Sequence, residues 1–411
     1  MARILVAGGS LGGLMVANIL LRDGHDVHVL EKVSGSLDGR GAGIVTHKRL
    51  VQGLQRAGLA SDASLGVSVP GRVLLDAQGR VQTEFDFPQV LTSWGRLYAL
   101  LYASFPRERY LQPVTVTSVQ AQAQGVRVHC GSEQFDADLL IASDGIRSAV
   151  RAQFAPQAQP QYAGYVAWRG VCDEAVLSRR TRDLVFGRFA FGLPPGEQLI
   201  AYPVAGPGHA LGVGQRRYNF VWYRPADAEQ LRSLLTDADG EHHPAGIAPN
   251  KVSWRAVAAM RLAARELLAP EFAEVMEKTA QPFLQAIYDL SSERIAFGCV
   301  ALMGDASFVA RPHVGAGVTK AAEDAMAVAD AIRAHGATSE ALLAYERDRL
   351  SVGQAIVERG RRLGAYLQRY SQGAHCRRTP QEEIDVAHET AVELDGCTID
   401  DLLSVRGAQP A

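Results

Sequence analysis

A glycine-rich turn near the start of the chain, "GGSLGG" at residues 8–13, has the residue types that bind a pyrophosphate. It follows the apolar run "RILVA" and opens an apolar stretch, so it joins an expected strand to an expected helix. Glycines there let a phosphate approach the backbone, and the first helical turn offers free N–H groups. The dinucleotide fingerprint Gly-x-Gly-x-x-Gly has Gly8 and Gly13 at its outer positions but Ser10 in the middle. Serine is small and its hydroxyl can donate to a phosphate, so we expect it to be tolerated.

An acidic residue supports the same interpretation. Glu31 stands 18 residues after Gly13, at the end of a second expected strand at 25–32. An acid at this point of a βαβ unit binds a ribose hydroxyl. A glycine-rich turn in an α/β fold without a ligand is the alternative, but the position of Glu31 favours a dinucleotide site.

Two later stretches each place an acidic turn at the end of an expected buried strand. "IASDGIRSAVR", 141–151, has Asp144 in an Asp–Gly turn before a helix start. "LMGDASFVARPHVGAG", 302–317, has Asp305 in a Gly–Asp turn before a second helix start. Each turn alone is common, so their significance comes from their order after the fingerprint.

The remaining pattern predicts two kinds of sheet. Helices are expected at 11–22, 47–58, 96–105 and 316–335, with a long one after 338. From about 161 to 224 the chain is rich in aromatic and β-branched residues, which indicates antiparallel strands of a separate sheet. The order therefore predicts a discontinuous α/β domain that is interrupted by a β-rich one.

Composition excludes several classes of protein. The 411 residues carry a formal net charge of -2, so we expect no nucleic-acid partner. No apolar run has the length of a membrane span, and the first residues have no signal-peptide layout. We therefore expect no membrane partner and a cytoplasmic protein. The cysteines are scattered without a Cys-x-x-Cys pair, which predicts neither a disulfide scaffold nor a metal site; they are Cys130, Cys172, Cys299, Cys376 and Cys397.

The three motifs together, in this order, resemble those of the single-component FAD-dependent aromatic hydroxylases, the flavoprotein monooxygenases typified by para-hydroxybenzoate hydroxylase. The resemblance runs from about residue 3 to residue 370. The stretches "GGS", "YAGYVAWRGV", "LIAYP" and "GDASFVARPH" resemble members that act on hydroxypyridines. The family implies a Rossmann-like FAD-binding domain interrupted by a β-sheet substrate domain, with a C-terminal helical region. The expected division is FAD-binding at 1–70, 95–160 and 286–335, substrate domain at 71–94 and 161–285, and C-terminal helices and tail at 336–411.

The resemblance also implies residues that contact FAD. Ser10 would lie at the pyrophosphate, Glu31 at the adenosine ribose and Asp305 at the ribityl region. N–H groups of the helix start at 315–317 would face the flavin pyrimidine, where negative charge develops on reduction. The implied cofactor contacts are Gly8, Gly9, Ser10, Leu11, Gly13, Glu31, Lys32, Arg40, Val45, Val116, Asp305, Pro312, Gly315, Ala316 and Gly317.

The chain departs from the family pattern at two positions. Many relatives begin a helix with Arg-x-x-Leu-x-x-x-Leu, whereas Trp94 takes the place of the arginine here. The histidine that commonly follows Gly-Asp-Ala is replaced by Ser307.

With one fingerprint only, NADH or NADPH is expected to dock transiently as co-substrate, beside O2 and a small aromatic substrate. The implied reaction is hydroxylation of an electron-rich ring, a hydroxypyridine such as 2,6-dihydroxypyridine, through a flavin C4a-hydroperoxide. The protein must exclude water and deprotonate the substrate hydroxyl. Pocket candidates are Tyr202, Trp222, Tyr223 and His313; Trp222 and Tyr223 alternate on one strand, so at most one should face the pocket. His313 is the first candidate for the base and Tyr202 the second.

Several alternatives stay open at this point. The substrate could be a phenolic acid or a polycyclic metabolite, and a buried carboxylate-binding arginine, with Arg169 as the candidate, would favour an acid. A non-catalytic flavin-binding redox module and a plain NAD-dependent dehydrogenase are rivals from other classes. His47 is expected at the surface, and "ERGRRLGAYLQR" is expected to be a solvated helix face, with a homodimer contact as the alternative.

Overall fold

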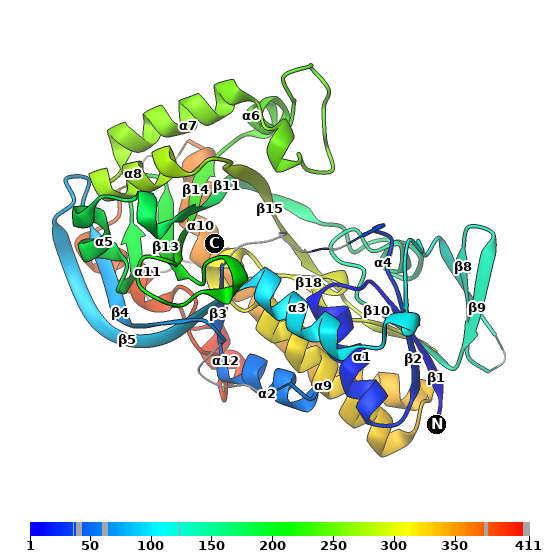
Figure 1. The fold of residues 1–411 in the computed structure, drawn as a ribbon. Coiled ribbons are helices and arrows are strands. Elements are labelled where there is room, and N and C mark those ends of the chain that lie inside the picture. Colours follow the sequence, from blue (N-terminus) through cyan, green and yellow to red (C-terminus); the bar gives the residue numbers. More distant parts are fainter. Residues whose placement is uncertain (36, 38–42, 60–64, 123, 374–376, 406–411) are drawn as a thin grey trace.

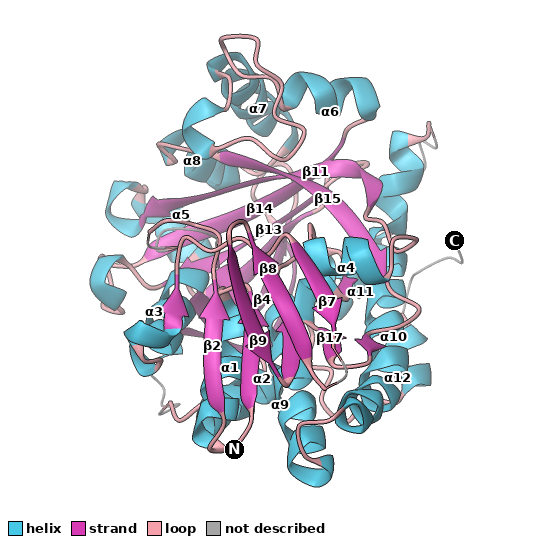
Figure 2. Ribbon diagram, turned by 90° about the vertical axis from the view of Figure 1, so that its right-hand side faces the viewer, coloured by secondary structure: helices cyan, strands magenta, loops and turns pink. Residues whose placement is uncertain are grey.

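The computed structural model describes residues 1–35, 37, 43–59, 65–122, 124–373 and 377–405 (Figure 1). A mainly parallel sheet lies between helices on one face and a small antiparallel sheet on the other, and a larger sheet lies beyond its carboxyl edge (Figures 1 and 2). This arrangement confirms the predicted fold class, an α/β dinucleotide-binding fold combined with a β-rich part and C-terminal helices.

Within the described residues the first sheet has the strand order β16-β17-β10-β1-β2-β6. Its strands are β1 (Arg3–Ala7), β2 (Asp26–Leu30), β6 (Tyr110–Leu111), β10 (Leu139–Ala142), β16 (Ala296–Phe297) and β17 (Val300–Leu302). All pairs are parallel except β16–β17. β10 and β17 are buried throughout, as expected for central strands covered on both faces. β16 and β17 form a tight antiparallel pair because Gly298, with φ +62°, turns the chain between them.

Helices cover one face of this sheet and a hairpin meander covers the other. Helices α1 (Leu11–Arg22), α2 (Lys48–Arg56), α3 (Trp94–Ser104) and α9 (Gly317–His335) share one continuous apolar core with its strands. Strands β7 (Ser118–Ala121), β8 (Val126–Cys130) and β9 (Glu133–Ala137) form the meander, with the expected turn before Val126, and α4 (Ala149–Phe154) follows β10.

The second sheet has the order β18-β15-β11-β14-β13-β12-β4-β5-β3 among the described residues. Its strands are β3 (Gly43–Thr46), β4 (Val67–Leu75), β5 (Val81–Ser93), β11 (Gln161–Asp173), β12 (Arg188–Gly192), β13 (Gln198–Val204), β14 (Arg217–Pro225), β15 (Phe283–Ser291) and β18 (Phe308–Val309). Helices α5 (Arg179–Val185), α6 (Ala228–Leu234), α7 (Trp254–Leu267) and α8 (Pro270–Lys278) pack on its outer face around a separate apolar core (Figure 1). We retain the division into FAD-binding and substrate segments as a proposal. The sheet itself draws its strands from both kinds of segment.

The C-terminal part of the chain is packed against this second sheet. Helix α10 (Ser339–Ser371) is followed by α11 (Pro380–Glu389) and α12 (Ile399–Leu403). The buried guanidinium of Arg72 on β4 donates to the carbonyl oxygens of Ala387, Thr390 and Ala391. Arg72 therefore fixes the end of α11 beside the inner face of the sheet. No helix among the described residues has both the length and the apolar character needed to cross a membrane.

Candidate active site

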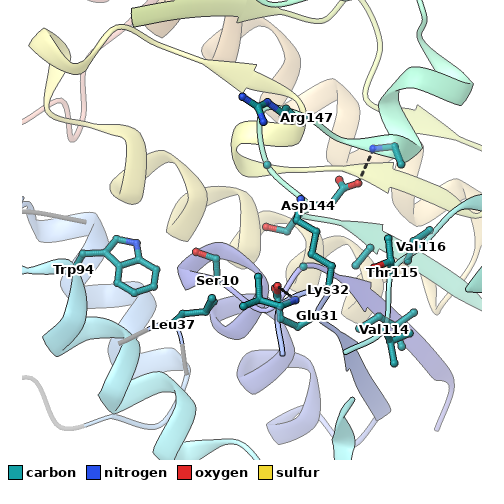
Figure 3. Close-up of a pocket in the computed structure, with 17 residues that line it drawn as sticks. Ser10, Glu31, Lys32, Leu37, Trp94, Val114, Thr115, Val116, Asp144 and Arg147 are labelled. Atoms are coloured by element: carbon teal, nitrogen blue, oxygen red, sulfur yellow. Dashed lines mark hydrogen bonds between the residues drawn. The ribbon is translucent and has the colours of Figure 1, made fainter. Parts of the chain in front are cut away.

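Register places the three sequence motifs at one edge of the parallel sheet. Ala7 lies opposite both Leu30 and Ala142, and Ala142 lies opposite Leu302, so the strands end together. The turns that follow β1, β10 and β17 therefore meet at the carboxyl edge, where α/β sheets bind ligands. A cavity of about 360 Å³ opens there, lined by residues that include Ser10, Glu31, Lys32, Val116 and Asp144 (Figure 3).

The glycine-rich turn has the shape that a phosphate requires. Gly8 has φ +98°, and a Cβ on it would lie 2.4 Å from the carbonyl oxygen of Ser143. A Cβ on Gly13 would lie 1.8 Å from the carbonyl oxygen of Gly8, so neither position tolerates a side chain. Helix α1 begins directly after Ser10, and neither a capping side chain nor an acidic residue occupies its first turn. Its N–H groups and the Ser10 hydroxyl are thus available to an anion.

Glu31 is fixed by two backbone groups at the end of β2. Its Oε2 accepts from the N–H of Gly9 at 2.8 Å, and its Oε1 accepts from the N–H of Val33 at 2.8 Å. Each carboxylate oxygen keeps acceptor capacity for a ribose hydroxyl. The buried carboxylate and the glycine turn fit the two ends of an adenosine pyrophosphate. Three of the implied cofactor contacts in this turn do not line the cavity, namely Gly9, Leu11 and Gly13. They shape the turn and the start of the helix instead.

The second motif contributes Asp144 to the wall of the first cavity. Its Oδ2 accepts from the N–H of Ala149 at 2.9 Å (Figure 3), and burial raises the pKa of its carboxyl. Arg147 lies at the rim of the same cavity. Arg151 on α4 donates to the carbonyl oxygen of Ala306 at 3.0 Å, so it joins the second turn to the third.

A second cavity of about 270 Å³ lies between the first cavity and the inner face of the larger sheet. Trp94, the first residue of α3, lines both cavities. The wall contains Val45 from β3 and several residues of the third motif that follow Asp305, among them Pro312, Gly315 and Gly317. A planar group that extends from the first cavity into the second would pass Trp94. Arg40 lies outside the described residues.

Asp305 faces this second cavity from a turn that buried charges hold in place. Lys320 donates to the carbonyl oxygen of Gly304 at 2.8 Å, and Asp324 accepts from the N–H of Gly304 at 3.0 Å. Burial raises the pKa of the Asp305 carboxyl; Lys320 lowers that pKa and Asp324 raises it. The buried side chains of Lys320 and Asp324 therefore fix the backbone of the third motif at Gly304.

Comparison with known proteins agrees with this geometry. A family profile described as "FAD binding domain-like" matches residues 162–289. The 2,6-dihydroxypyridine 3-monooxygenase of Paenarthrobacter nicotinovorans is 30% identical over 375 residues, which are 89% of this chain and 91% of that protein. The solved structure of 2,6-dihydroxypyridine-3-hydroxylase from Arthrobacter nicotinovorans matches with a TM-score of 0.84 and 29% identity, over 89% of this chain and 93% of that one. The chain belongs to the FAD-dependent aromatic monooxygenases.

A more distant structure shows the same fold. Klebsiella pneumoniae HpxO, solved with FAD and uric acid, matches with a TM-score of 0.72 at 22% identity, over 98% of this chain and 97% of that chain. Membership of the FAD-dependent aromatic monooxygenases, shown by the 30% identical relative, makes this protein an enzyme with FAD as its cofactor, and NAD(P)H is the co-substrate typical of the family. This confirms the family, the enzyme class and the cofactor predicted from sequence.

Tyr202 and Tyr223 both line the second cavity of this monooxygenase. The Tyr202 ring stacks on Phe189 with centroids 4.8 Å apart. Gly43 leaves room for that ring, because a Cβ there would lie 2.3 Å from a Tyr202 ring carbon. Burial raises the pKa of Tyr202 to about 12 although the charge of Arg169 opposes the rise, so its hydroxyl is protonated at neutral pH.

Trp222 does not belong to the pocket. It pairs with Trp168 and Leu199 on the face of the sheet that packs against α7 and α8, and it is fully buried in that outer core. Side chains alternate along β14, so Tyr223 faces inward and Trp222 outward. The structure thus brings Tyr223 but not Trp222 to the cavity wall, so Trp222 is withdrawn from the pocket candidates.

The structure also places His313 outside the cavity wall. Its Nε2 hydrogen-bonds the hydroxyl of Tyr165 at 2.9 Å, and its ring packs on Tyr223 with centroids 4.2 Å apart. His313 is 1% exposed and is absent from the wall of the second cavity, whereas its neighbour Pro312 lines it. A proton on a substrate hydroxyl cannot reach His313 directly, so the geometry argues against its role as base.

His47 is buried, contrary to the expected surface position. Its Nδ1 lies 3.0 Å from the hydroxyl of Thr319 at the start of α9, and only 3% of the residue is exposed. Burial lowers the pKa of His47, which keeps the ring neutral. The sequence placed it at a helix start but gave no sign that α9 would cover it.

Burial, with the nearby charges of Arg311 and Arg378, lowers the pKa of His313 to about 3. A histidine whose folded pKa lies below its unfolded value favours unfolding as the pH falls through 6.5, because only the unfolded chain binds the proton. We expect His313→Gln to be less stable than the parent near pH 7. Urea denaturation should show that the difference in free energy of unfolding between the two proteins narrows by about 1 kcal/mol as the pH falls from 7 to about 5.5. Parallel pH profiles of the two proteins would contradict this prediction.

Two wall residues could not be found from sequence as contributors to the site. From sequence, Trp94 is only a departure from the family's Arg-x-x-Leu-x-x-x-Leu pattern. In the structure its ring stacks on Tyr98 one helical turn later, with centroids 5.1 Å apart. Ala391, from the segment after α11, lines the second cavity, and its N–H donates to the carbonyl oxygen of His313 at 2.9 Å. Only the family's arginine at the position of Trp94 could have pointed to either of them.

Proposed function

We propose that this monooxygenase hydroxylates a small hydroxylated aromatic ring of the hydroxypyridine type, held in the second cavity. One observation carries the proposal. The second cavity adjoins the cofactor cavity, shares Trp94 with it and includes Asp305, Pro312 and Gly315 of the third motif in its wall. Its volume of about 270 Å³ suits a single ring, and its wall combines apolar side chains with polar groups that can hold ring substituents. Similarity to a 2,6-dihydroxypyridine 3-monooxygenase over most of both chains supports the same substrate class.

The cofactor roles belong to the same proposal. Ser10 and the first turn of α1 would hold the pyrophosphate, Glu31 and Lys32 the adenosine, and Val116 the adenine. Val45, Asp305 and the helix start at 312–317, which includes Ala316, would lie along the flavin end. Gly8, Gly9, Leu11 and Gly13 would keep the turn open for the phosphates. When bound, FAD would supply the redox chemistry, in which electrons from NADH or NADPH activate O2 so that one oxygen atom enters the ring and the other leaves as water.

The chain contributes exclusion of water and orientation of the ring. Val45, Phe189, Ile200 and Ile287 form apolar walls, and Ala391 closes one side. The hydroxyl groups of Tyr202 and Tyr223 are protonated donors that can hold an oxygen substituent of the ring. Substrate and flavin would then meet in a site shielded from water.

Stopped-flow reduction of the FAD-loaded enzyme tests this function. We expect 2,6-dihydroxypyridine to accelerate flavin reduction by NADH or NADPH about tenfold or more, and to yield a product with one more oxygen atom by mass spectrometry. Arg169, a wall cation that has no ion-pair partner among the described residues, favours a second candidate, a phenolic acid, for which 4-hydroxybenzoate is the probe. If no ring compound alters the reduction rate, the proposed substrate class fails.

A further inference from the structure

Ala391, in the segment that follows α11, has a backbone conformation that residues with a side chain rarely adopt. Its φ is +52°, and among the described residues His209, at φ +64°, is the one other non-glycine residue with a positive φ. This left-handed conformation costs free energy for a residue with a Cβ, whereas glycine adopts it freely. Ala391 is also buried and lines the second cavity. A strained residue in a cavity wall points to a function of its side chain.

The methyl group of Ala391 fills the space beside Gly315. Gly315 ends the short 3-10 turn before α9 and lines the same cavity. A Cβ on Gly315 would lie 2.5 Å from the Cβ of Ala391, so the two segments meet without space for a second side chain. Since Gly315 belongs to the helix start proposed to lie along the flavin, the methyl group lies where the cofactor and the substrate would meet.

Hydrogen bonds hold the backbone of Ala391 from both sides. Its N–H donates to the carbonyl oxygen of His313 at 2.9 Å. Its carbonyl oxygen accepts from Nη2 of Arg72 at 3.2 Å and from Nε2 of Gln89 at 3.2 Å. Arg72 is 0% exposed and also donates to the carbonyl oxygen of Thr390 at 2.8 Å. Because buried donors of this kind lose much free energy when their acceptors move away, the methyl group has a fixed position.

The neighbouring wall residues have little freedom to adapt to a change at position 391. Val45, Phe189 and Tyr202 line the cavity and belong to the same buried apolar cluster as Ala391. The Phe189 ring stacks on Tyr202, and the guanidinium of Arg72 lies 5.2 Å from its centroid. A close-packed wall absorbs little change in volume. A different side chain at position 391 would therefore change the volume of the cavity, which is about 270 Å³.

We propose that Ala391 determines the size of the ring that the second cavity accepts, so that a residue of the C-terminal segment acts as a specificity determinant. The proposal rests on the proposed function and adds this residue to it. Glycine at position 391 would enlarge the cavity by one methyl group, and a longer side chain would fill part of it. One methyl or methylene group in a closed pocket changes discrimination between substrates about 10- to 200-fold.

Anaerobic binding of ring probes to the FAD-loaded enzyme, followed by flavin absorbance, tests the proposal. The probes are 2,6-dihydroxypyridine and its 3-methyl and 4-methyl derivatives. Relative to the unmethylated ring, we expect Ala391→Gly to bind at least one methyl derivative about tenfold or more tightly than the parent enzyme does. Ala391→Asn should weaken the binding of all three probes about tenfold or more, because asparagine tolerates the left-handed backbone but fills the cavity.

His209→Gly is the matched control for the backbone change. It replaces the other described non-glycine residue of positive φ, which lies outside the wall of the second cavity. We expect it to leave all three dissociation constants unchanged. Circular dichroism and the FAD content establish that each variant is folded and loaded. If Ala391→Asn does not fold, the ratio of dissociation constants in Ala391→Gly decides alone.

The outcomes separate this inference from the proposed function. If the parent enzyme binds none of the three rings, the proposed function fails and the inference fails with it. If the parent binds 2,6-dihydroxypyridine and Ala391→Gly leaves the ratios of the dissociation constants unchanged, the function stands and the size proposal is overturned. Equal weakening of all probes in Ala391→Gly, or undiminished binding in folded Ala391→Asn, would also overturn it, because either result gives the side chain at position 391 no part in the choice of ring.

Discussion

Replacing Asp324 by alanine is expected to lower the free energy of unfolding by about 3–5 kcal/mol. Oδ1 of Asp324 accepts from Arg349 Nε at 2.9 Å, and Oδ2 accepts from Lys320 Nζ at 3.2 Å and from the N–H of Gly304 at 3.0 Å. All three charged side chains are buried. Removal of the carboxylate leaves two buried cations and one backbone donor without their shared acceptor. Urea denaturation of the FAD-free protein measures the loss.

The pH dependence of this effect has a definite sign. Burial alone would raise the pKa of Asp324, but Lys320 and Arg349 hold the pKa below its ordinary value of 3.8. A carboxyl whose folded pKa is lowered stabilises the protein above its unfolded pKa and loses that contribution as the pH falls. The difference in free energy of unfolding between the parent and Asp324→Ala should therefore be largest at neutral pH and decrease as the pH falls through the acid range.

Asp330→Ala is the matched control on the same helix. Asp330 is 58% exposed in its side chain and pairs with Arg56 and Arg333 at the surface. Exposed pairs contribute about 0–1 kcal/mol, so this control should lose little stability. Equal losses in Asp324→Ala and Asp330→Ala would show that the buried cluster adds nothing beyond a surface ion pair.

The part of the site that local pattern determines could be predicted from the sequence. Ser10, Glu31, Asp144 and Asp305 each follow a buried strand, and parallel strands bring such positions to one edge whatever the connections between them. The glycines identify places where a Cβ would collide with backbone. These features require only strand type and chain order, both of which are visible in the sequence.

The rest depends on which way a side chain points and on distant packing. His313 follows Pro312 in a short 3-10 turn, so the two side chains point in different directions. Pro312 lines the cavity, whereas His313 lies behind Tyr223. Ala391 reaches the wall because Arg72, far earlier in the chain, holds the carbonyl oxygens around it. No local pattern encodes either arrangement, since both depend on contacts between residues remote in sequence.

Asp305→Ala is expected to weaken FAD binding about 10- to 150-fold, measured by fluorescence titration of the FAD-free protein. On the proposed assignment the carboxylate accepts a hydrogen bond from the ribityl chain, and a charge-assisted bond of this kind contributes about 1.5–3 kcal/mol. The structure adds a second expectation. No hydrogen bond joins the Asp305 carboxylate to another described residue, and its side chain is exposed where it faces the second cavity.

The Asp305 side chain is exposed in the FAD-free protein and makes no hydrogen bond to another described residue, so its removal should cost little folding free energy. Asp305→Ala should therefore leave the free energy of unfolding nearly unchanged, while it weakens FAD binding. Asp305→Asn keeps the shape and an acceptor oxygen and should bind FAD with intermediate affinity. Asp183→Ala, on the exposed face of α5, is the control that should change neither quantity. Unchanged FAD affinity in Asp305→Ala would refute the assignment. A fall in both the FAD affinity and the free energy of unfolding would instead identify Asp305 as a structural residue, because the loss of a ligand contact alone does not lower the stability of the FAD-free protein.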